Sequence, residues 1–67
     1  MVIVKSDINR MLTYILGEGQ MVIDLWWTSR NIAMAGKSPE EVYQSGDEGR
    51  AFVYNYVYSF YEIEGGA

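Results

Sequence analysis

Apolar residues near the start of the chain recur at the spacing of a helix face. They are Ile8, Met11, Leu12, Ile15 and Leu16. These positions follow i, i+3, i+4, i+7 and i+8, which is the pattern of one buried stripe. Ser6 or Asp7 precedes the stripe and is suited to cap the first free N–H groups, and Gly17 and Gly19 follow it. The pattern predicts an amphipathic helix that Ser6–Asp7 opens and Gly17 ends.

A second, shorter helical pattern runs from Gln20 to Trp27. The apolar side chains that share its face are Met21, Val22, Leu25 and Trp26. Asp24 lies opposite, while Ile23 and Trp27 fall outside the stripe. The helix is therefore apolar over more than half its circumference. We expect it to be sandwiched between other elements or to pack against another chain.

The middle of the chain combines a loop with a strong helix start. Residues 28–37 are mostly small or polar and predict a loop or a frayed turn. Ser38 then provides an N-cap, Pro39 suits the first helical position, and Glu41 stands at the capping-box position. The helix that they open is short and ends at Gly46.

The last segment, residues 47–64, fits two patterns. Aromatic side chains alternate with a period of two, which favours a strand: Phe52, Tyr54, Tyr56, Tyr58 and Phe60. Phe52, Val53, Tyr56, Val57 and Phe60 also form a helical stripe. A strand of about twelve residues is unusual in so small a domain, so we predict a helix. In the alternative, the strand would pair with residues 2–4.

These patterns predict a mostly α-helical, single-domain bundle of three to four short helices. We divide the chain into an arm (1–5), a helical core (6–64) and a tail (65–67). The first four residues form either a short N-terminal strand or a disordered arm. A chain of 67 residues buries a small core, so it needs dense packing or a partner chain, and we expect a homo-oligomer.

The composition lacks residue types on which most catalytic sites depend. Cys and His are both absent, which excludes disulfides, thiolate metal sites and the commonest general base. The acidic pairs Glu40–Glu41 and Asp47–Glu48 are explained by helix starts. We therefore expect no catalytic residue, no metal and no cofactor, and we predict that the protein is not an enzyme.

The charge is acidic, with five Lys and Arg against nine Asp and Glu. The basic residues are scattered, so the electrostatic footprint of a nucleic-acid binder is missing. No apolar stretch reaches the ~20 residues that a membrane span needs, and the first residues lack the features of a signal peptide. We expect a cytoplasmic protein that binds neither nucleic acid nor membrane directly.

Aromatic residues and the central loop supply the candidate contacts. Because adjacent helical residues point about 100° apart, we expect Trp26 to be buried and Trp27 to lie at a surface. Several tyrosines fan around the last helix, so they form a second contact surface, for a homodimer or a partner groove, or are simply exposed. The partner-binding candidates are Trp27, Arg30, Asn31, Tyr54, Tyr58 and Tyr61. The structural candidates are Trp26, Gly36, Ser38, Pro39 and Gly46.

The order of these signals resembles the C-terminal toxin-binding domain of Xre/MbcA/ParS-type antitoxins, over roughly residues 8–61. Trp26–Trp27 stands for an aromatic–aliphatic pair at a helix end. The loop matches in register at Ser29, Asn31, Ala33, Met34, Gly36, Lys37, Ser38 and Pro39, and Gly46 closes the short helix. The chain departs from the pattern where Arg30 and Ile32 replace loop prolines and where Ala35 replaces a glycine.

The resemblance implies a small helical module that neutralises a toxin by direct binding. In the family the toxin is of the RES type, which degrades NAD, and the antitoxins tend to dimerise. Sixty-seven residues leave no room for the helix-turn-helix domain of the family, so we do not expect its DNA binding. Two other hypotheses stay open: a phage-encoded inhibitor of a different host enzyme or defence complex, and a structural subunit of a homo-oligomer.

Overall fold

Four α-helices and a short 3-10 helix form the part of the chain that the structure, a computed structural model, describes: residues 2–17 and 19–63. The elements are α1 (Lys5–Leu16), α2 (Gln20–Thr28), η1 (Ile32–Met34), α3 (Pro39–Gln44) and α4 (Asp47–Tyr61). These residues contain no β-strand. The prediction of a small, mostly helical bundle is confirmed, and so is the choice of helix over strand for the last segment. Glu64 and the predicted tail, 65–67, lie outside the described residues.

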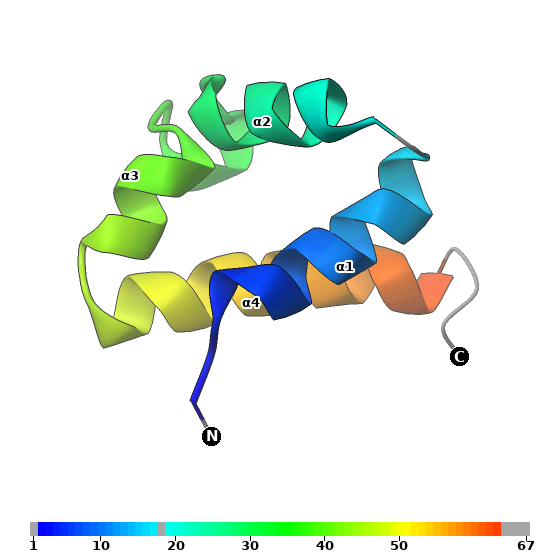
Figure 1. The fold of residues 1–67 in the computed structure, drawn as a ribbon. Helices are drawn as coiled ribbons and strands as arrows, with labels where there is room; N and C mark the ends of the chain where they lie inside the picture. Colours follow the sequence, from blue (N-terminus) through cyan, green and yellow to red (C-terminus); the bar gives the residue numbers. More distant parts are fainter. Residues whose placement is uncertain (1, 18, 64–67) are drawn as a thin grey trace.

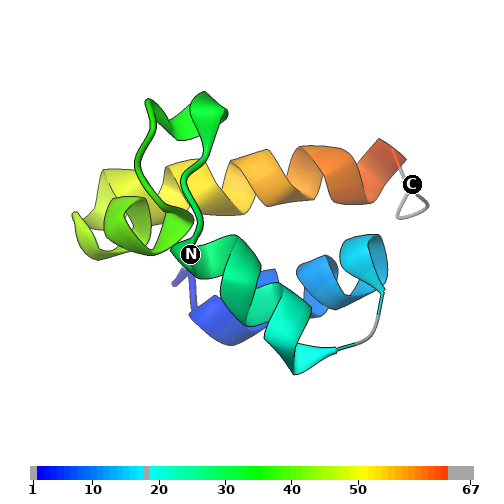
Figure 2. The same cartoon turned by 90° about the horizontal axis from the view of Figure 1, so that it is seen from above.

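The chain passes three times along the molecule. α1 and α4 run in the same general direction and pack against each other (Figure 1, Figure 2). α2 returns over α1 in the opposite direction, and the loop and α3 close the end at which α4 begins. α4 packs against both α1 and α3, so the last helix joins the other parts of the bundle.

The core lies where these helices meet. The buried side chains are Ile8, Met11, Leu12, Ile23, Trp27, Met34, Val53 and Val57. α1 contributes the first half of its predicted stripe, and Ile8 is fully buried. From α4 come Val53 and Val57, four residues apart and therefore on one face. Short β-branched side chains on that face let α1 and α4 approach closely.

The alternating aromatics of α4 form two separate edges beside the buried Val53–Val57 stripe. One edge carries Phe52, Tyr56 and Phe60, and the other carries Tyr54, Tyr58 and Tyr61. A step of two residues turns a helix by about 200°, so alternate side chains fall on opposite flanks. The rings within each edge touch: Phe52 stacks on Tyr56 and Tyr54 stacks on Tyr58, with centroids 6.3 and 6.1 Å apart. The period of two thus marks a helix with two aromatic sides.

The first helix begins earlier than the capping residues predict. α1 starts at Lys5, its N-cap is Val4, and no side chain caps it. The prediction that Ser6 or Asp7 caps the helix is therefore wrong. Asp7 already lies in the first turn, where its N–H donates to the Val4 carbonyl at 3.1 Å. Its carboxylate interacts favourably with the positive end of the helix dipole. Residues 2–4 precede the helix without forming a strand, so the arm is shorter than predicted and the strand alternative fails for these residues.

Lys5 joins the start of α1 to α2 and α3. Its ammonium lies 4.5 Å from the ring centroid of Trp27 and pairs with the Glu40 carboxylate. The hydrogen bond from Lys5, helped by one from Gln44, holds the pKa of the Glu40 carboxyl below its usual range. The ion pair is partly exposed, so solvent screens it and its contribution to stability is small.

The glycines that were predicted to end the first and the third helix, α1 and α3, lie where expected. Gly17 ends α1 with φ of 88°, and Gly46 separates α3 from α4 with φ of 138°. A side chain at Gly46 would be strained, because L-residues rarely adopt such a φ. The glycine therefore lets the chain reverse between two helices that are joined by only two residues, Ser45 and Gly46.

The capping box at the start of α3 is present as predicted. Ser38 Oγ accepts the Glu41 N–H at 3.2 Å, and Glu41 Oε1 accepts the Ser38 N–H at 2.9 Å. Pro39 occupies the first helical position and is fully buried. The predicted structural roles of Ser38 and Pro39 are thus confirmed.

Replacing Ser38 by Ala is expected to lower the free energy of unfolding by about 1 kcal/mol, because the Glu41 N–H loses its acceptor. In a domain of this size the melting midpoint then falls by about 4–8 °C. Thermal unfolding followed by circular dichroism measures the shift. Ser29→Ala, at an exposed position after α2, is the matched control and leaves the midpoint in place. Equal midpoints for wild type and Ser38→Ala would contradict the role of the cap.

Candidate protein-binding site

Trp27 is a core residue, and the prediction that it lies at a surface is wrong. Its side chain is 3% exposed, and its indole N–H donates to Oδ1 of Asn9 at 2.6 Å. Its ring also packs edge-to-face on Tyr43, with centroids 5.6 Å apart. A partner cannot reach this side chain, so Trp27 leaves the set of candidate contacts.

The buried face of α2 is the reverse of the predicted one. Ile23 and Trp27 point inward, whereas Met21 is 76% and Leu25 is 59% exposed. Trp26, which we expected to be buried, is only half-buried. A helix that is apolar all round offers two stripes, and the neighbours decide between them. Here Asn9 of α1 supplies the acceptor that the Trp27 indole needs, and the opposite face stays uncovered by the described residues.

The loop after α2 is organised around Asn31. Asn31 Oδ1 accepts the Ala33 N–H at 2.9 Å, which fixes the turn. Its backbone carbonyl accepts N–H groups from Met34 and Gly36, and its own N–H donates to the Lys37 carbonyl, each at 3.0 Å. With its side-chain oxygen already engaged, Asn31 acts mainly as a structural residue of the loop.

Two exposed side chains flank Asn31. Arg30 lies on the surface, and Ile32, which the sequence did not single out, is 97% exposed. Gly36 closes the turn with φ of 82°, after Ala35 at φ of 60°. The predicted structural role of Gly36 therefore rests on a left-handed backbone that glycine adopts without strain. The loop presents Arg30 and Ile32 on a hydrogen-bonded frame.

A groove lined by tyrosines runs between α1 and α4. Its volume is about 440 Å³, and it is lined by Asp7, Arg10, Met11, Tyr14, Tyr54, Tyr58 and Tyr61. We call it the tyrosine groove. It brings together three of the predicted partner contacts, Tyr54, Tyr58 and Tyr61. Tyr14 joins them from α1, and the sequence pattern did not single it out.

The rings of the tyrosine groove support one another. Tyr14 packs edge-to-face on Tyr61 with centroids 5.4 Å apart, and Tyr58 lies 6.3 Å from Tyr61. Tyr14 is 57% and Tyr58 is 40% exposed. Such a cluster presents rigid aromatic area to solvent, and tyrosine also offers a hydroxyl for hydrogen bonding. These are the properties of residues that dominate protein interfaces.

One acidic and one basic residue lie at one end of the tyrosine groove. Asp7 and Arg10 form an ion pair at 3.7 Å, and their side chains are 44% and 80% exposed. An exposed pair of this kind contributes little to stability. Either partner is therefore free to exchange its contact for a charged group of a bound protein at small cost.

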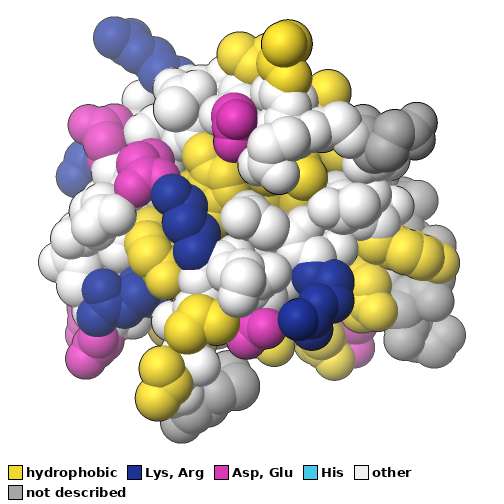
Figure 3. All heavy atoms as spheres, in the orientation of Figure 1, with side chains coloured by type: hydrophobic (Ala, Val, Ile, Leu, Met, Phe, Trp, Pro, Cys, Tyr) yellow, Lys and Arg dark blue, Asp and Glu magenta, His cyan; other side chains and the backbone are white. Residues whose placement is uncertain are grey.

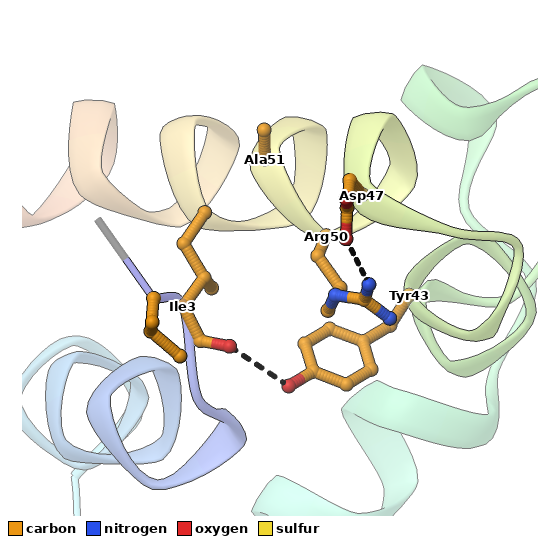
Figure 4. Close-up of a pocket in the computed structure, with 6 residues that line it drawn as sticks. Ile3, Tyr43, Asp47, Arg50 and Ala51 are labelled. Carbon is orange, nitrogen blue, oxygen red and sulfur yellow. Dashed lines mark hydrogen bonds and ion pairs between the residues drawn. The ribbon is translucent and has the colours of Figure 1, made fainter.

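A second pocket, of about 650 Å³, lies between the N-terminal arm and the start of α4 (Figure 4). The Tyr43 hydroxyl donates to the Ile3 carbonyl at 3.5 Å, and the Arg50 guanidinium pairs with Asp47 while lying 5.8 Å from the Tyr43 ring. Figure 4 shows Tyr43 reaching toward Ile3 across the pocket. These groups are engaged with one another, so this pocket anchors the arm.

The predicted contacts do not all form one site. The tyrosines gather along α4 beside α1, whereas Arg30 and Asn31 belong to the loop at the other end of the molecule (Figure 2). The tyrosine groove is therefore the strongest candidate site, and the loop is a separate feature.

Comparison with protein-family models, curated proteins and solved structures finds no match for this chain. Within the described residues, no group of three or more His, Cys, Asp or Glu side chains is placed to hold a metal ion. None of the described helices combines the length and the apolar character that crossing a membrane requires.

Proposed function

We propose that this chain is a protein-binding module without catalytic activity and that it holds its partner in the tyrosine groove. The observation that carries the proposal is the cluster of four tyrosines, from two helices, around one open groove. Tyrosine supplies large contact area with few rotatable bonds, so little conformational entropy is lost on binding. The absence of His and Cys from the sequence agrees with a binding role.

We further propose that the partner is a bacterial toxin, which the chain neutralises by direct contact. Support comes from the resemblance of residues 26–46 to the antitoxin loop and from the net charge of −4, which suits a basic partner. The chain also already places cations over aromatic rings, at Lys5–Trp27 and Arg50–Tyr43. Exposed tyrosines offer the same cation–π contact to a basic side chain of a partner.

Co-expression with capture tests this function. A tagged chain is expressed together with the product of the neighbouring gene, and bound proteins are identified by mass spectrometry. We expect one toxin to be retained and the growth arrest that it causes to be relieved. Recovery of a polymerase, nuclease or defence complex would replace the toxin with a host target, and recovery of the chain alone would favour a structural subunit.

A further inference from the structure

The tyrosine groove carries about one side chain per turn on each of its two walls. On α4, Tyr54, Tyr58 and Tyr61 are spaced i, i+4 and i+7, so they follow one edge of the helix. At 1.5 Å per residue, the distance along the helix from Tyr54 to Tyr61 is about 10.5 Å. On α1, Asp7 and Tyr14 have the same spacing, and this helix runs in the same general direction as α4. The groove is therefore an elongated channel about 10 Å long.

A segment in the polyproline II conformation matches the length of the tyrosine groove. Such a segment rises about 3.1 Å per residue with three residues per turn, so positions i and i+3 share an edge and lie about 9.3 Å apart. Two prolines with this spacing reach the Tyr54 ring at one end of the channel and the Tyr61 ring at the other. Grooves lined by aromatic side chains are a recurring way of binding such proline-rich segments.

The tyrosine hydroxyls favour an extended segment over a helical one. Hydrogen bonds between described residues engage the Tyr43 hydroxyl with the Ile3 carbonyl, but none of them engages a hydroxyl of the tyrosine groove. A polyproline II backbone has no internal hydrogen bonds, so its carbonyls can accept from these hydroxyls. The carbonyls of a helix are already bonded, and a bound helix needs an apolar groove. Apart from Met11, the described lining residues of the tyrosine groove are aromatic or charged.

The charges at one end of the tyrosine groove suit a basic residue next to the prolines. Asp7 pairs with Arg10 at 3.7 Å, and the two side chains are 44% and 80% exposed. Figure 3 shows acidic and basic side chains next to each other on the surface along α1, with hydrophobic side chains beside them. A basic side chain of a bound segment can replace Arg10 at Asp7, because so exposed an ion pair contributes little to stability. The net charge of −4 also attracts a basic segment.

We propose that the tyrosine groove binds a proline-rich segment of a partner protein in the polyproline II conformation, with prolines at i and i+3 and a basic residue beside them. The inference rests on the proposed function, since it names the chemistry of the segment that the groove holds. Proline-rich chains already populate this conformation when free, so binding orders them at low entropic cost.

A smaller apolar groove, of about 210 Å³, lies on the opposite flank of α4 and provides an internal comparison. Trp26, Tyr56 and Phe60 are among its lining residues, and none of the described residues that line it is charged. It therefore has no carboxylate for a basic residue of the segment. A proline-rich basic peptide is expected to select the tyrosine groove over the apolar groove.

NMR titration of the isotope-labelled chain with synthetic peptides tests the segment. Two peptides carry the sequence Pro-Ala-Ala-Pro with arginine at one end or the other, and in a third both prolines are alanine. We expect one of the first two to bind with a dissociation constant below about 1 mM, and the third at least about 10-fold more weakly. The amide signals that shift should be those of Tyr14, Tyr58 and Tyr61 rather than those of Trp26 and Phe60.

Single substitutions separate the contributions of ring, hydroxyl and charge. Tyr58→Phe keeps the ring and removes the hydroxyl, so we expect binding about 3–10-fold weaker. Asp7→Asn is expected to weaken the arginine peptide about 3-fold and to leave a peptide with alanine in place of arginine unchanged. Phe52→Ala, on the opposite edge of α4, is the matched control and should bind the peptides like wild type.

Absence of peptide binding at millimolar concentration would overturn the proposal. So would equal binding of the peptide without prolines, or signal shifts that map to the apolar groove. If no peptide bound while a captured partner still lost affinity for the Tyr14→Ala, Tyr58→Ala variant, the proposed function would stand and this inference alone would be wrong.

Discussion

Trp27→Ala is expected to lower the free energy of unfolding by about 3–5 kcal/mol, the usual cost of truncating a core tryptophan. The substitution opens a cavity next to Ile23 and leaves Oδ1 of Asn9 without the indole donor that it contacts at 2.6 Å. A 67-residue domain has a total stability of only about 3–10 kcal/mol. The variant should therefore be largely unfolded at 37 °C.

The neighbouring tryptophan is the matched control for this prediction. Trp26 is half-buried at the edge of the apolar groove, so Trp26→Ala is expected to cost about 1–2 kcal/mol, in proportion to the apolar area that it loses. Urea unfolding followed by circular dichroism at 222 nm compares the two variants without relying on tryptophan fluorescence. A larger loss for Trp26→Ala than for Trp27→Ala would contradict the orientation of α2.

Gly49→Ala is expected to destabilise the protein by about 2 kcal/mol or more, although helix propensity alone would make alanine the better residue by about 1 kcal/mol. A Cβ atom at Gly49 would overlap the backbone carbonyl of Val42 and the hydroxyl of Ser45. The Ser45 hydroxyl is itself bonded to the Val42 carbonyl at 2.6 Å, so neither group can move aside freely. A loss of stability indicates that α3 packs closely on α4 at Gly49. A gain of stability would indicate that helix propensity decides the effect.

Asn55→Ala provides the control for Gly49→Ala. Asn55 lies in the same helix and is exposed, and the substitution also introduces alanine, the residue with the highest helix propensity. We expect it to raise the free energy of unfolding by about 0.5 kcal/mol. If Gly49→Ala stabilised the protein as well, the close contact between α3 and α4 would be refuted.

Features that are set by neighbouring residues could be predicted from the sequence. The α1 stripe, the glycine that ends it and the Ser38–Glu41 capping box depend on residues within one or two turns of each other. The structure has the glycine and the capping box as predicted, and it buries the first half of the stripe. We predicted a helix over residues 47–64 because a strand of that length would be unusual, although the aromatic residues alternate as in a strand. The structure has the helix α4 at Asp47–Tyr61. Its two aromatic edges explain why both patterns were present in one segment.

Features that depend on packing between distant residues could not be predicted. α2 carries apolar side chains all round. The stripe with more apolar residues, which includes Leu25 and Trp26, was predicted to face the core, and this prediction was wrong. What decides the orientation is a polar group eighteen positions away, Asn9, which accepts the Trp27 indole N–H. Tyr14 was missed for the same reason: only the packing of α1 on α4 brings it to Tyr61. The resemblance to antitoxins stays a prediction.

Calorimetric titration of the captured partner with wild type and with a Tyr14→Ala, Tyr58→Ala variant tests the tyrosine groove. Both side chains are well exposed and come from different helices, so the fold tolerates their loss. We expect the dissociation constant to rise at least about 30-fold, as for hot-spot tyrosines. Phe52→Ala, on the opposite edge of α4 and 44% exposed, is the control and should bind like wild type. Unchanged affinity in the double variant would show that the partner binds elsewhere.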